Sequence, residues 1–340
     1  MADASTVMIP EPAVSPRPPL RPVAPAAVPR RVAVSLVIVT WNSERWIDRC
    51  LKSIPAACEG IPYEIVVYDN GSEDQTLSKL QGNATLIRSA SNDGLAVATN
   101  RAVREASGRY LFLLNPDCEL APGALTKLVE FLDAHPDVDA AAPLLVDESG
   151  DSQREFQLRR FPTLGSLVSE ILLLDKVLPA NRATARYRYR DLDLSKPQRI
   201  EQPAAAAFLI RREAFEAVGP LDEQFSPAWF EDVDYCRRLA ASGKQVYVVP
   251  AAGARHFGGA SLEHITFTEF NDIWYRNMSR YARKWLGRRE AEILRWVIVL
   301  GMLLRIVAVV GGIAHRNRAK RDALRAFTTV LRHAIARWDE

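Results

Sequence analysis

Three apolar stretches in the N-terminal half of the chain each end in a polar turn. Residues 32–42 read VAVSLVIVTWN, residues 64–72 read EIVVYDNGS, and residues 110–117 read YLFLLNPD. Near-continuous apolar runs rich in Val, Ile and Leu are typical of strands buried on both faces of a parallel sheet. Because the carboxyl ends of parallel strands meet at one edge of a sheet, we expect the three polar turns to converge there.

A helix is predicted between the second and third of these strands. The segment SNDGLAVATNRAVREASG begins a helical pattern near Asp93 and ends it at Gly108, so the connections are β-α crossovers. The chain is therefore expected to form an α/β fold. Any one of the polar turns is well explained by ordinary turn or capping chemistry, but three in series favour a binding site.

The acidic segment FEDVDYCRRLAASG is a second source of candidate chemistry, and it fits a helical period. Glu231, Asp232 and Asp234 fall in its first turn and Gly243 closes it. Acids in a first turn also suit the helix dipole, so a solvated or capping role is one interpretation. Trp229 begins an aromatic pair before them, which favours carboxylates that emerge from an apolar wall, where a raised pKa suits a general base.

The residues after this helix predict a short strand at 244–250, followed by a loop that contains glycines. His256 lies in that loop. A lone histidine is most often structural, but a position just beyond a strand, on a glycine-permissive loop, favours contact with a metal ion or a phosphate group.

Taken together, these segments resemble a known family. The motifs VSLVIVTWN, VVYDNGSEDQT, SNDGLAVATN, GRYLFLLNPD, FLIRREAFEAVGPLDEQF, FEDVDYCRRLAASG and ARHFGGAS occur in the order found in family 2 glycosyltransferases. From residue 34 to 261 the chain is most similar to their bacterial rhamnosyltransferase-like branch. The resemblance implies a GT-A fold, Rossmann-like, with a mostly parallel sheet flanked by helices. It also implies a nucleotide-sugar donor, a divalent metal ion and inversion at the anomeric carbon.

The resemblance also implies which residues bind the donor. In similar proteins the aspartate of the DNGS turn, here Asp69, contacts the nucleobase or ribose, and Thr40 and Asn42 line the same pocket. The SNDGLAVATN motif adds three donor-binding candidates, Asn92, Gly94 and Asn100.

The metal-binding DxD of the family corresponds here to Asn115-Pro116-Asp117, a departure shared with the rhamnosyltransferase-like branch. The resemblance makes Asp117 the one carboxylate ligand, lets His256 complete the metal or diphosphate contacts, and leaves Asn115 a hydrogen-bonding role with the donor. A single carboxylate with diphosphate oxygens and water suits Mg²⁺ or Mn²⁺.

By the same resemblance Asp232, with Glu231 beside it, is the catalytic base that takes the proton of the acceptor hydroxyl. Inversion needs one base and a sink for the leaving diphosphate, and no enzyme nucleophile. The acceptor is less transferable, because four alanines at 204–207 stand where this branch has a Trp-x-x-Gly-Ala-like turn. The run QLRRF at 157–161 resembles the QxxRW signature of processive polysaccharide synthases, but it precedes the acidic motif and is given no role.

Composition sets the domain organisation. A chain of 340 residues with 48% hydrophobic content suits one large α/β domain with additions. We expect this domain at 32–285, with an acceptor-side insertion at 151–203. The basic end of that insertion is either a contact for a lipid-linked diphosphate or a solvated loop. Residues 1–31 hold eight of the 21 prolines and predict a disordered tail.

Net charge and cysteine spacing limit the expected partners and cellular compartment of the protein. The net charge is only +3, and we expect no nucleic-acid partner. The four cysteines lie on expected helices or a loop and show no C-x-x-C spacing, which predicts reduced thiols in the cytoplasm.

The last segment, 286–340, predicts two helices that associate with a membrane. Residues 296–314 are apolar apart from Arg305 and have basic flanks. Beyond them an apolar stripe recurs at helical spacing, at Leu324, Phe327, Leu331, Ile335 and Trp338. Such a stripe opposite arginines is typical of a helix in a membrane interface, with core packing as the alternative. We expect peripheral or monotopic attachment to the cytoplasmic leaflet of the plasma membrane, and whether residues 296–314 span the membrane stays open.

The predicted function is an inverting, metal-dependent glycosyltransferase of cell-envelope glycan assembly. It would move a sugar from a nucleotide-sugar donor, with dTDP-rhamnose as the candidate, to a lipid-linked saccharide acceptor. Asn115 and the alanine run leave a catalytically inactive nucleotide-sugar-binding scaffold as the alternative. A dinucleotide-dependent dehydrogenase is disfavoured, because no G-x-G-x-x-G follows the first strand.

Overall fold

The structure is a computed structural model that describes residues 32–80, 84–178, 182–259, 263–312 and 319–338. The predicted tail at 1–31 and the end of the apolar stretch 296–314 lie outside the described residues.

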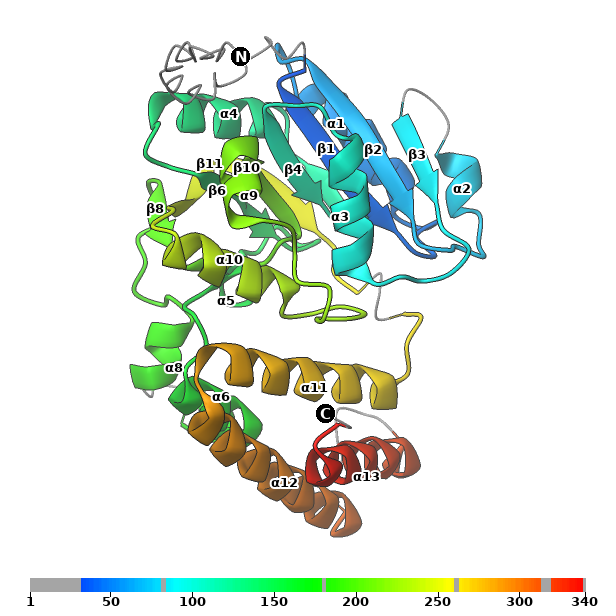
Figure 1. Ribbon diagram of the computed structural model, residues 1–340, viewed down its shortest axis with the longest axis vertical. Helices are drawn as coiled ribbons and strands as arrows, with labels where there is room; N and C mark the ends of the chain where they lie inside the picture. The colour runs from blue at the N-terminus through cyan, green and yellow to red at the C-terminus, as the bar shows by residue number, and fades with distance from the viewer. Residues whose placement is uncertain (1–31, 81–83, 179–181, 260–262, 313–318, 339–340) are drawn as a thin grey trace, which may run out of the picture.

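One sheet of nine strands organises the N-terminal two thirds of the chain (Figure 1). Four parallel strands form one half, in the order β3 (Ala84–Arg88), β2 (Tyr63–Asp69), β1 (Val34–Thr40) and β4 (Tyr110–Leu114). Beyond β4 the order continues with β10 (Ala207–Arg211), β6 (Ala140–Val146), β11 (Val246–His256) and β5 (Cys118–Leu120), and β8 (Gln198–Ile200) also pairs with β11. β11 is parallel to β6, whereas β10, β5 and β8 are antiparallel to their neighbours.

Helices cover both faces of this sheet, which explains the continuous apolar runs of its strands. On one face α1 (Ile47–Ala57) and α4 (Ala124–Ala134) pack against Leu36 and Ile38 of β1. On the other face Val37 of β1 packs in the core formed with three helices, α3 (Leu95–Glu105), α9 (Arg212–Val218) and α10 (Glu231–Ala241). A short helix, α2 (Thr76–Lys79), follows β2. The predicted α/β fold with its crossovers is confirmed.

Most of the segment between β6 and β10 lies outside the sheet, and of its described strands only β8 pairs with the sheet, at β11. It contains α5 (Arg154–Gln157), β7 (Leu158–Arg159), α6 (Leu164–Ile171), α7 (Leu174–Val177), α8 (Arg182–Tyr187), β8 and β9 (Gln202–Pro203). β7 and β9 pair as a two-stranded antiparallel ribbon beside the sheet. This is the region expected at 151–203 as an insertion.

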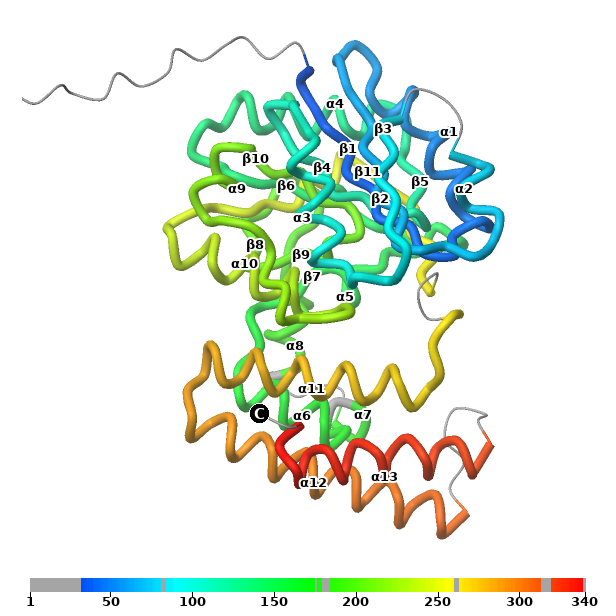
Figure 2. The backbone as a smooth tube through the Cα atoms, turned by 45° about the vertical axis from the view of Figure 1, so that its right-hand side comes forward, coloured from blue at the N-terminus to red at the C-terminus, as the bar shows by residue number. Residues whose placement is uncertain are grey.

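A helical layer forms the remainder of the described chain. It consists of α11 (Phe267–Trp285), α12 (Arg288–Val310) and α13 (Lys320–Ala336), with α6 packed against α12. Both views place α11 between the sheet layer and the α12–α13 pair (Figures 1 and 2). These helices share a core of their own, which also includes Phe225 and Phe230 from the loop before α10.

The structure corrects three details of the sequence analysis. His256 is the last residue of β11 and not part of a loop, because the strand continues past Pro250 through an irregular register to pair with β5. Cys118 begins β5, so it lies on a strand, although all four cysteines are free and buried as expected for reduced thiols. The helix expected from Asp93 begins at Leu95, after Gly94.

Most of the apolar stripe of α13 packs within the helical layer, which is the core-packing alternative, whereas Ile335 stays 56% exposed. Phe327 is buried, contacts Phe267 with ring centroids 6.0 Å apart, and belongs to the core with α11 and α12. Trp338 is held by its indole N–H, which donates to Asp272 of α11 at 2.9 Å. Packing on a neighbouring helix satisfies an amphipathic pattern as well as a bilayer does, and sequence periodicity alone does not separate the two.

The outward face of α12 is different. Leu303, Leu304 and Val307 are exposed by 46%, 54% and 69%. Arg305 turns the other way and donates to the carbonyl of Ile171, the last residue of α6, at 2.7 Å. Among the described residues α12 is the one helix long and apolar enough to cross a membrane by length and composition.

Candidate active site at the carboxyl edge of the sheet

The polar turns after β1, β2 and β4 meet at one edge of the sheet, as predicted. Trp41, Asn70 and Asp117 from these three turns line a common cavity of about 140 Å³. A second cavity, of about 220 Å³, is lined by Glu231 and Asp232. Both cavities include Leu95, Asn115, Ala228 and Trp229 among their lining residues, so they form one site in two parts. We call them the turn cavity and the acid cavity.

Asparagine side chains shape the turn cavity. Asn70 donates to the side-chain oxygen of Asn92 at 2.8 Å and accepts the backbone N–H of Asp93 at 2.8 Å. The same Asn92 oxygen accepts the N–H of Gly94 at 2.9 Å. Gly94 has φ +89°, and a Cβ there would meet the backbone of Pro227 at 3.1 Å, so glycine permits the close approach of two loops. Asn92 and Gly94 thus belong to the wall of the site.

Three other donor-binding candidates, Thr40, Asn42 and Asp69, are not among the lining residues of the turn cavity. Asp69 is buried, and its two carboxylate oxygens accept the hydroxyl of Thr40 at 3.0 Å and the N–H of Ser72 at 3.1 Å. Asn42, which takes a left-handed conformation, accepts the N–H of Glu73 at 2.8 Å through its side chain. These bonds tie the ends of β1 and β2 together below the cavity.

Asn100 is not brought to this cluster. Its amide donates to the carbonyl of Leu221 and to Glu223, and its side-chain oxygen accepts the N–H of Leu221 at 2.9 Å. It joins α3 to the loop before α10. A motif match does not distinguish such a structural asparagine from one that faces a ligand.

Asp117 and His256 lie together at the end of β4 and β11. Their side chains are both buried, with His256 Nε2 3.6 Å from Asp117 Oδ1. Gln153 fixes the imidazole: its Oε1 is 2.9 Å from His256 Nδ1, and its amide donates to the His256 carbonyl at 2.8 Å. Phe156 stacks on the ring at a centroid distance of 5.2 Å. With Nδ1–H donating to Gln153, Nε2 keeps its lone pair toward Asp117.

This pair fits a metal ion better than it fits an ion pair. Burial lowers the pKa of His256 below its usual value, although Asp117 opposes the shift, so the neutral ligand form is favoured. Cys118 is the third residue of the group whose ligand atoms all lie within 4.8 Å of one another. Burial raises the pKa of its thiol well above the usual value, and the S–H donates to the Ala206 carbonyl at 3.2 Å, so it is a poor ligand in this form. Asp117 Oδ1 and His256 Nε2 are then the two candidate ligand atoms, and Asp117 lines the turn cavity.

The two carboxylates of the acid cavity differ in environment. Glu231 is buried, and one of its oxygens, Oε2, has no hydrogen-bond partner among the described residues. Asp232 accepts the N–H of Ala205 at 3.2 Å. Burial raises the pKa of both, and for Glu231 the charge of Asp232 raises it further, while Arg159 and the N–H groups of Ala205 and Val233 oppose the rise at Asp232. Glu231 therefore binds a proton more readily than Asp232, and Asp232 is the more readily ionised of the two.

The backbone before these acids is strained. Trp229 and Phe230 have φ of +71° and +74°, which bulky residues rarely adopt. Asn277 of α11 holds this turn, donating to the carbonyls of Ala228 and Trp229 at 2.8 and 3.1 Å. The aromatic pair thus forms the apolar wall that the sequence predicted beside the carboxylates.

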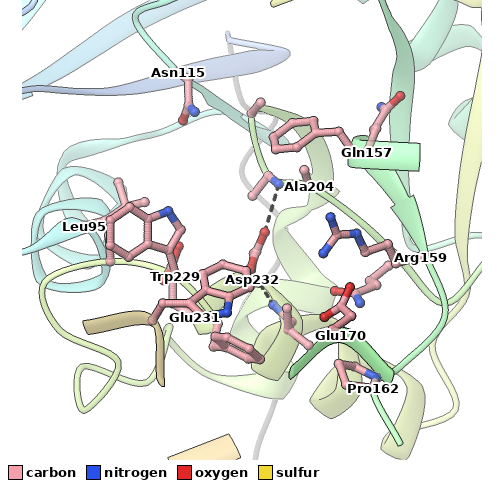
Figure 3. Close-up of a pocket in the computed structure, with 18 of the residues that line it drawn as sticks. Leu95, Asn115, Gln157, Arg159, Pro162, Glu170, Ala204, Trp229, Glu231 and Asp232 are labelled. Atoms are coloured by element: carbon pink, nitrogen blue, oxygen red, sulfur yellow. Dashed lines mark hydrogen bonds between the residues drawn. The ribbon is translucent and has the colours of Figure 1, made fainter. Parts of the chain in front are cut away.

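Sequence reasoning missed the far wall of the acid cavity. Arg159, Tyr187 and Glu170 line it. Figure 3 shows Arg159 and Glu170 on the opposite side of the cavity from Leu95 and Trp229. Arg159 hydrogen bonds Tyr187 and interacts electrostatically with Glu170. Arg159 lies in the QLRRF run that was given no role on grounds of order, and its glutamine and arginine were the signal that could have found this wall.

The fold is that of GT-A glycosyltransferases. The crystal structure of GalNAc-T7 with UDP, GalNAc and Mn²⁺ matches with a TM-score of 0.52, over 91% of this chain and 57% of that chain, at 16% identity, which shows the fold alone. The chain belongs to glycosyl transferase family 2, whose family model matches residues 35–219.

Its relatives include rhamnosyltransferases. The N-acetylglucosaminyl-diphospho-decaprenol L-rhamnosyltransferase of Mycobacterium tuberculosis is 29% identical over 307 residues, which cover 84% of this chain and 95% of the relative. Rhamnosyltransferase WbbL of Escherichia coli is 27% identical over 66% of this chain and 83% of its own length. The dolichol-phosphate mannosyltransferase of Pyrococcus furiosus is 26% identical over 78% of this chain and 68% of its own length. The predicted family resemblance is confirmed.

Proposed function

We propose that this protein is an inverting glycosyltransferase that moves L-rhamnose from dTDP-rhamnose to a lipid-linked saccharide of the cell envelope. The observation that carries the proposal is the Asp232 carboxylate in the wall of the acid cavity, which shares Asn115 with the turn cavity. The donor would occupy the turn cavity and the acceptor the acid cavity. The names of two relatives support rhamnose as the sugar and, for one of them, a lipid-linked acceptor.

Asp232 would take the proton of the acceptor hydroxyl. Arg159 and backbone N–H groups favour its ionised form more than that of Glu231, and the N–H of Ala205 fixes its orientation. Its raised pKa brings a carboxylate closer to the basicity that proton transfer at neutral pH needs. Burial is the cause of that rise. With one base on the acceptor side and attack opposite the leaving diphosphate, the configuration of the anomeric carbon inverts.

Asp117 and His256 would hold Mg²⁺ or Mn²⁺ together with the donor diphosphate. When bound, the cation supplies positive charge to the diphosphate oxygens. Gln153 and Phe156 keep the imidazole in one orientation, and the chain thereby presents Nε2 and Oδ1 3.6 Å apart for a single ion. The nearby Asn115 would bind the donor through a hydrogen bond.

Arg159 would bind the acceptor. Its guanidinium lies in the acid cavity with Tyr187, on the opposite side from Trp229. Arginine suits the phosphate groups of a lipid-linked saccharide, because its planar fork matches two phosphate oxygens. This assigns the segment at 151–203 to the acceptor side.

The outward face of α12 would lie on the cytoplasmic leaflet of the plasma membrane. Its exposed residues Trp296, Leu300, Leu303, Leu304, Val307 and Val310 form one stripe at helical spacing. The α6–α7 segment, which comes earlier in the chain, is held to α12 through Arg305. It adds two exposed apolar residues, Val177 and Leu178, to the apolar surface. An exposed apolar stripe of this size next to arginines fits a bilayer interface with anionic lipids.

A donor screen tests the proposal. The full-length protein is given a panel of nucleotide sugars with Mg²⁺ or Mn²⁺, with and without a polyprenyl-diphosphate saccharide, and sugar transfer is followed together with the anomeric configuration of the product. We expect transfer of rhamnose with inversion. Transfer of another sugar would show that dTDP-rhamnose is not the donor. Donor binding without any turnover would favour the catalytically inactive scaffold.

A further inference from the structure

Two cavities in the helical layer bring together an excess of positive charge that the proposed reaction does not use. They measure about 390 and 540 Å³ and share Arg283, Arg337 and Trp338 as lining residues. A water molecule takes about 30 Å³ in the liquid, so each cavity has room for a hydrated polyatomic anion. We call them together the basic cavity.

Most of its positive charge comes from one face of α11. Arg276, Arg280, Arg283 and Lys284 line it from that helix. Burial and the charges of Arg276 and Arg283 hold the pKa of Arg280 below its usual value. Like charges so close together are unfavourable, and a bound anion would relieve the repulsion.

The neighbouring helices add three more arginines. Arg288 and Arg295 come from α12, and Arg337 follows α13. The described lining residues therefore carry seven cationic side chains against two carboxylates, Asp222 and Glu292. Both carboxylates already pair, Asp222 with Lys284 at 2.6 Å and Glu292 with Arg295. Positive charge in excess remains.

A buried hydroxyl in the wall is the independent sign of a ligand. Ser279 of α11 is 6% exposed and lines the basic cavity, and its Oγ has no hydrogen-bond partner among the described residues. The Nε of Arg276 is likewise buried without such a partner there. Unsatisfied buried polar atoms cost free energy, so donors of this kind usually meet a ligand or bound water.

The basic cavity is separate from the active site. α11 presents Trp274 to the acid cavity and Ile273 to the turn cavity, whereas Ser279 and Arg283 lie on another face of the helix. A donor or acceptor in the active site would not fill it.

We propose that the basic cavity is a second binding site, for a phosphate or diphosphate group, in which the arginines of α11 and α12 with Arg337 bind the oxygens and Ser279 donates a further hydrogen bond. Arginine predominates over lysine in the lining, and its fork geometry favours phosphate over a small spherical anion. Two sources supply this chemistry, the headgroup of an acidic phospholipid and a soluble phosphate compound. Arg295 lies one residue before Trp296 of the apolar stripe of α12, so a headgroup could reach the cavity from a membrane surface.

Pyrophosphate is the probe for the test. Calorimetric titration and thermal shift are carried out on the full-length protein with a chelator present, which removes divalent metal from the active site. We expect saturable binding with a higher melting temperature. The pair Arg283→Gln and Arg337→Gln should weaken binding at least ~10-fold, because two charge-assisted hydrogen bonds are lost. Arg337→Gln alone changes an exposed side chain, and Ser279→Ala removes only the hydroxyl, so both should weaken binding less while the fold is kept.

The matched control is Arg325→Gln with Arg332→Gln. These two arginines are exposed on α13 and do not line the basic cavity. We expect unchanged pyrophosphate binding in this control. An equal loss in the control, or no pyrophosphate binding by the wild-type chain, would overturn the proposal. Because Asp339 and Glu340 follow Trp338 in the sequence, the titration is repeated on a chain that ends at Trp338; loss of binding there also contradicts it.

Vesicles distinguish the two sources. Sedimentation with phosphatidylglycerol–phosphatidylcholine vesicles is compared for the wild type and the Arg283/Arg337 variant. If the Arg283/Arg337 variant binds vesicles less than the wild type does, and pyrophosphate competes with the vesicles, the ligand is a lipid headgroup. If the wild type binds pyrophosphate but both proteins bind vesicles equally, the ligand is a soluble phosphate compound. Repeating the titration on Asp232→Asn separates this proposal from the proposed function, since that variant should bind pyrophosphate normally whether or not Asp232 is the base.

Discussion

The carboxyl edge of the sheet and the helical layer both contain clusters of polar and charged side chains, but they differ in how far these side chains pair with one another. At the sheet edge Asp69, Asn70 and Asn92 bond to one another's loops, and the polar groups hold a fixed shape. In the helical layer the basic cavity keeps an excess of arginines, and α12 keeps an apolar stripe exposed. In the proposals above, the first region holds the reacting ligands in one geometry, and the second meets a larger anionic surface or group.

Loss of the candidate metal ligand gives the largest expected effect. Asp117→Ala should abolish turnover and weaken donor binding, and excess chelator should do the same to the wild type until Mg²⁺ or Mn²⁺ is restored. Donor turnover and donor titration measure both. Glu119→Ala is the control, since Glu119 is two residues away and exposed on β5, and it should be near normal. Undiminished wild-type activity in excess chelator would refute the metal site.

Removal of the proposed base comes next. Asp232→Asn should lower kcat by at least ~10²-fold with donor affinity nearly intact, because its role is confined to the transition state. The comparison is Asp234→Asn: Asp234 is buried and bonded to Arg238, Lys284 and Trp285, so its loss should lower the melting temperature first. Near-normal turnover of Asp232→Asn would move the role to Glu231, the other carboxylate of the acid cavity.

Substitutions in the core of the helical layer should lower the free energy of unfolding, whereas those at the sheet edge should lower the rate of sugar transfer. Phe327→Ala is expected to cost about 3–5 kcal/mol of unfolding free energy, the usual loss for a buried phenylalanine. Urea unfolding measures it. A change below about 1 kcal/mol would mean that α13 does not pack on the core as described.

Substitutions in the exposed stripe of α12 should change membrane binding and leave stability nearly unchanged. Leu303→Ser with Val307→Ser should leave the melting temperature nearly unchanged but weaken binding to anionic vesicles by ~10-fold or more, since apolar burial in the bilayer is lost. Vesicle sedimentation is the measurement. Vesicle binding equal to that of the wild type would remove the stripe from the membrane proposal. These point changes are cleaner than deleting residues 290–340, which would expose the core face of α11.

The smallest expected effect is a pH dependence of stability. The folded-state pKa of Glu231 is raised by burial, so the protonated form stabilises the fold fully below the ordinary pKa of 4.5, and this contribution is lost as pH rises through the raised value. Glu231→Gln stays neutral and should gain stability relative to the wild type as pH rises. Denaturant unfolding between pH 5 and 8.5 checks it, and a difference independent of pH would show that Glu231 is already ionised.

The strands and turns of the site were predictable because their signals are local. The apolar runs of β1, β2 and β4 need burial on both faces, and their turn residues follow directly in sequence. The acids at the start of α10 were found for the same reason. Asn70 was visible in its turn, but only the contact with Asn92 shows that its side chain shapes the cavity.

The far wall of the acid cavity and the fate of the C-terminal helices were not predictable in this way. Arg159 reaches the cavity because β7 pairs with β9, which lies 43 residues farther along the chain. Asn100 lies outside the site because its side chain is bonded to Leu221, in the loop on which α3 packs. Neither pairing leaves a periodic mark in the sequence.

The sequence by itself determined the α/β class, the family and the acids and turns that line the site, because burial on two faces and the geometry of strand ends act within a few residues. Only the tertiary structure decided which of two similar apolar helices is covered. The stripe of α13 packs on α11 and α12, while the outward face of α12 stays exposed. The physical reason is that the free energy of burying an apolar face is non-directional and nearly the same for a protein core and a bilayer, so its destination depends on which neighbours the fold supplies.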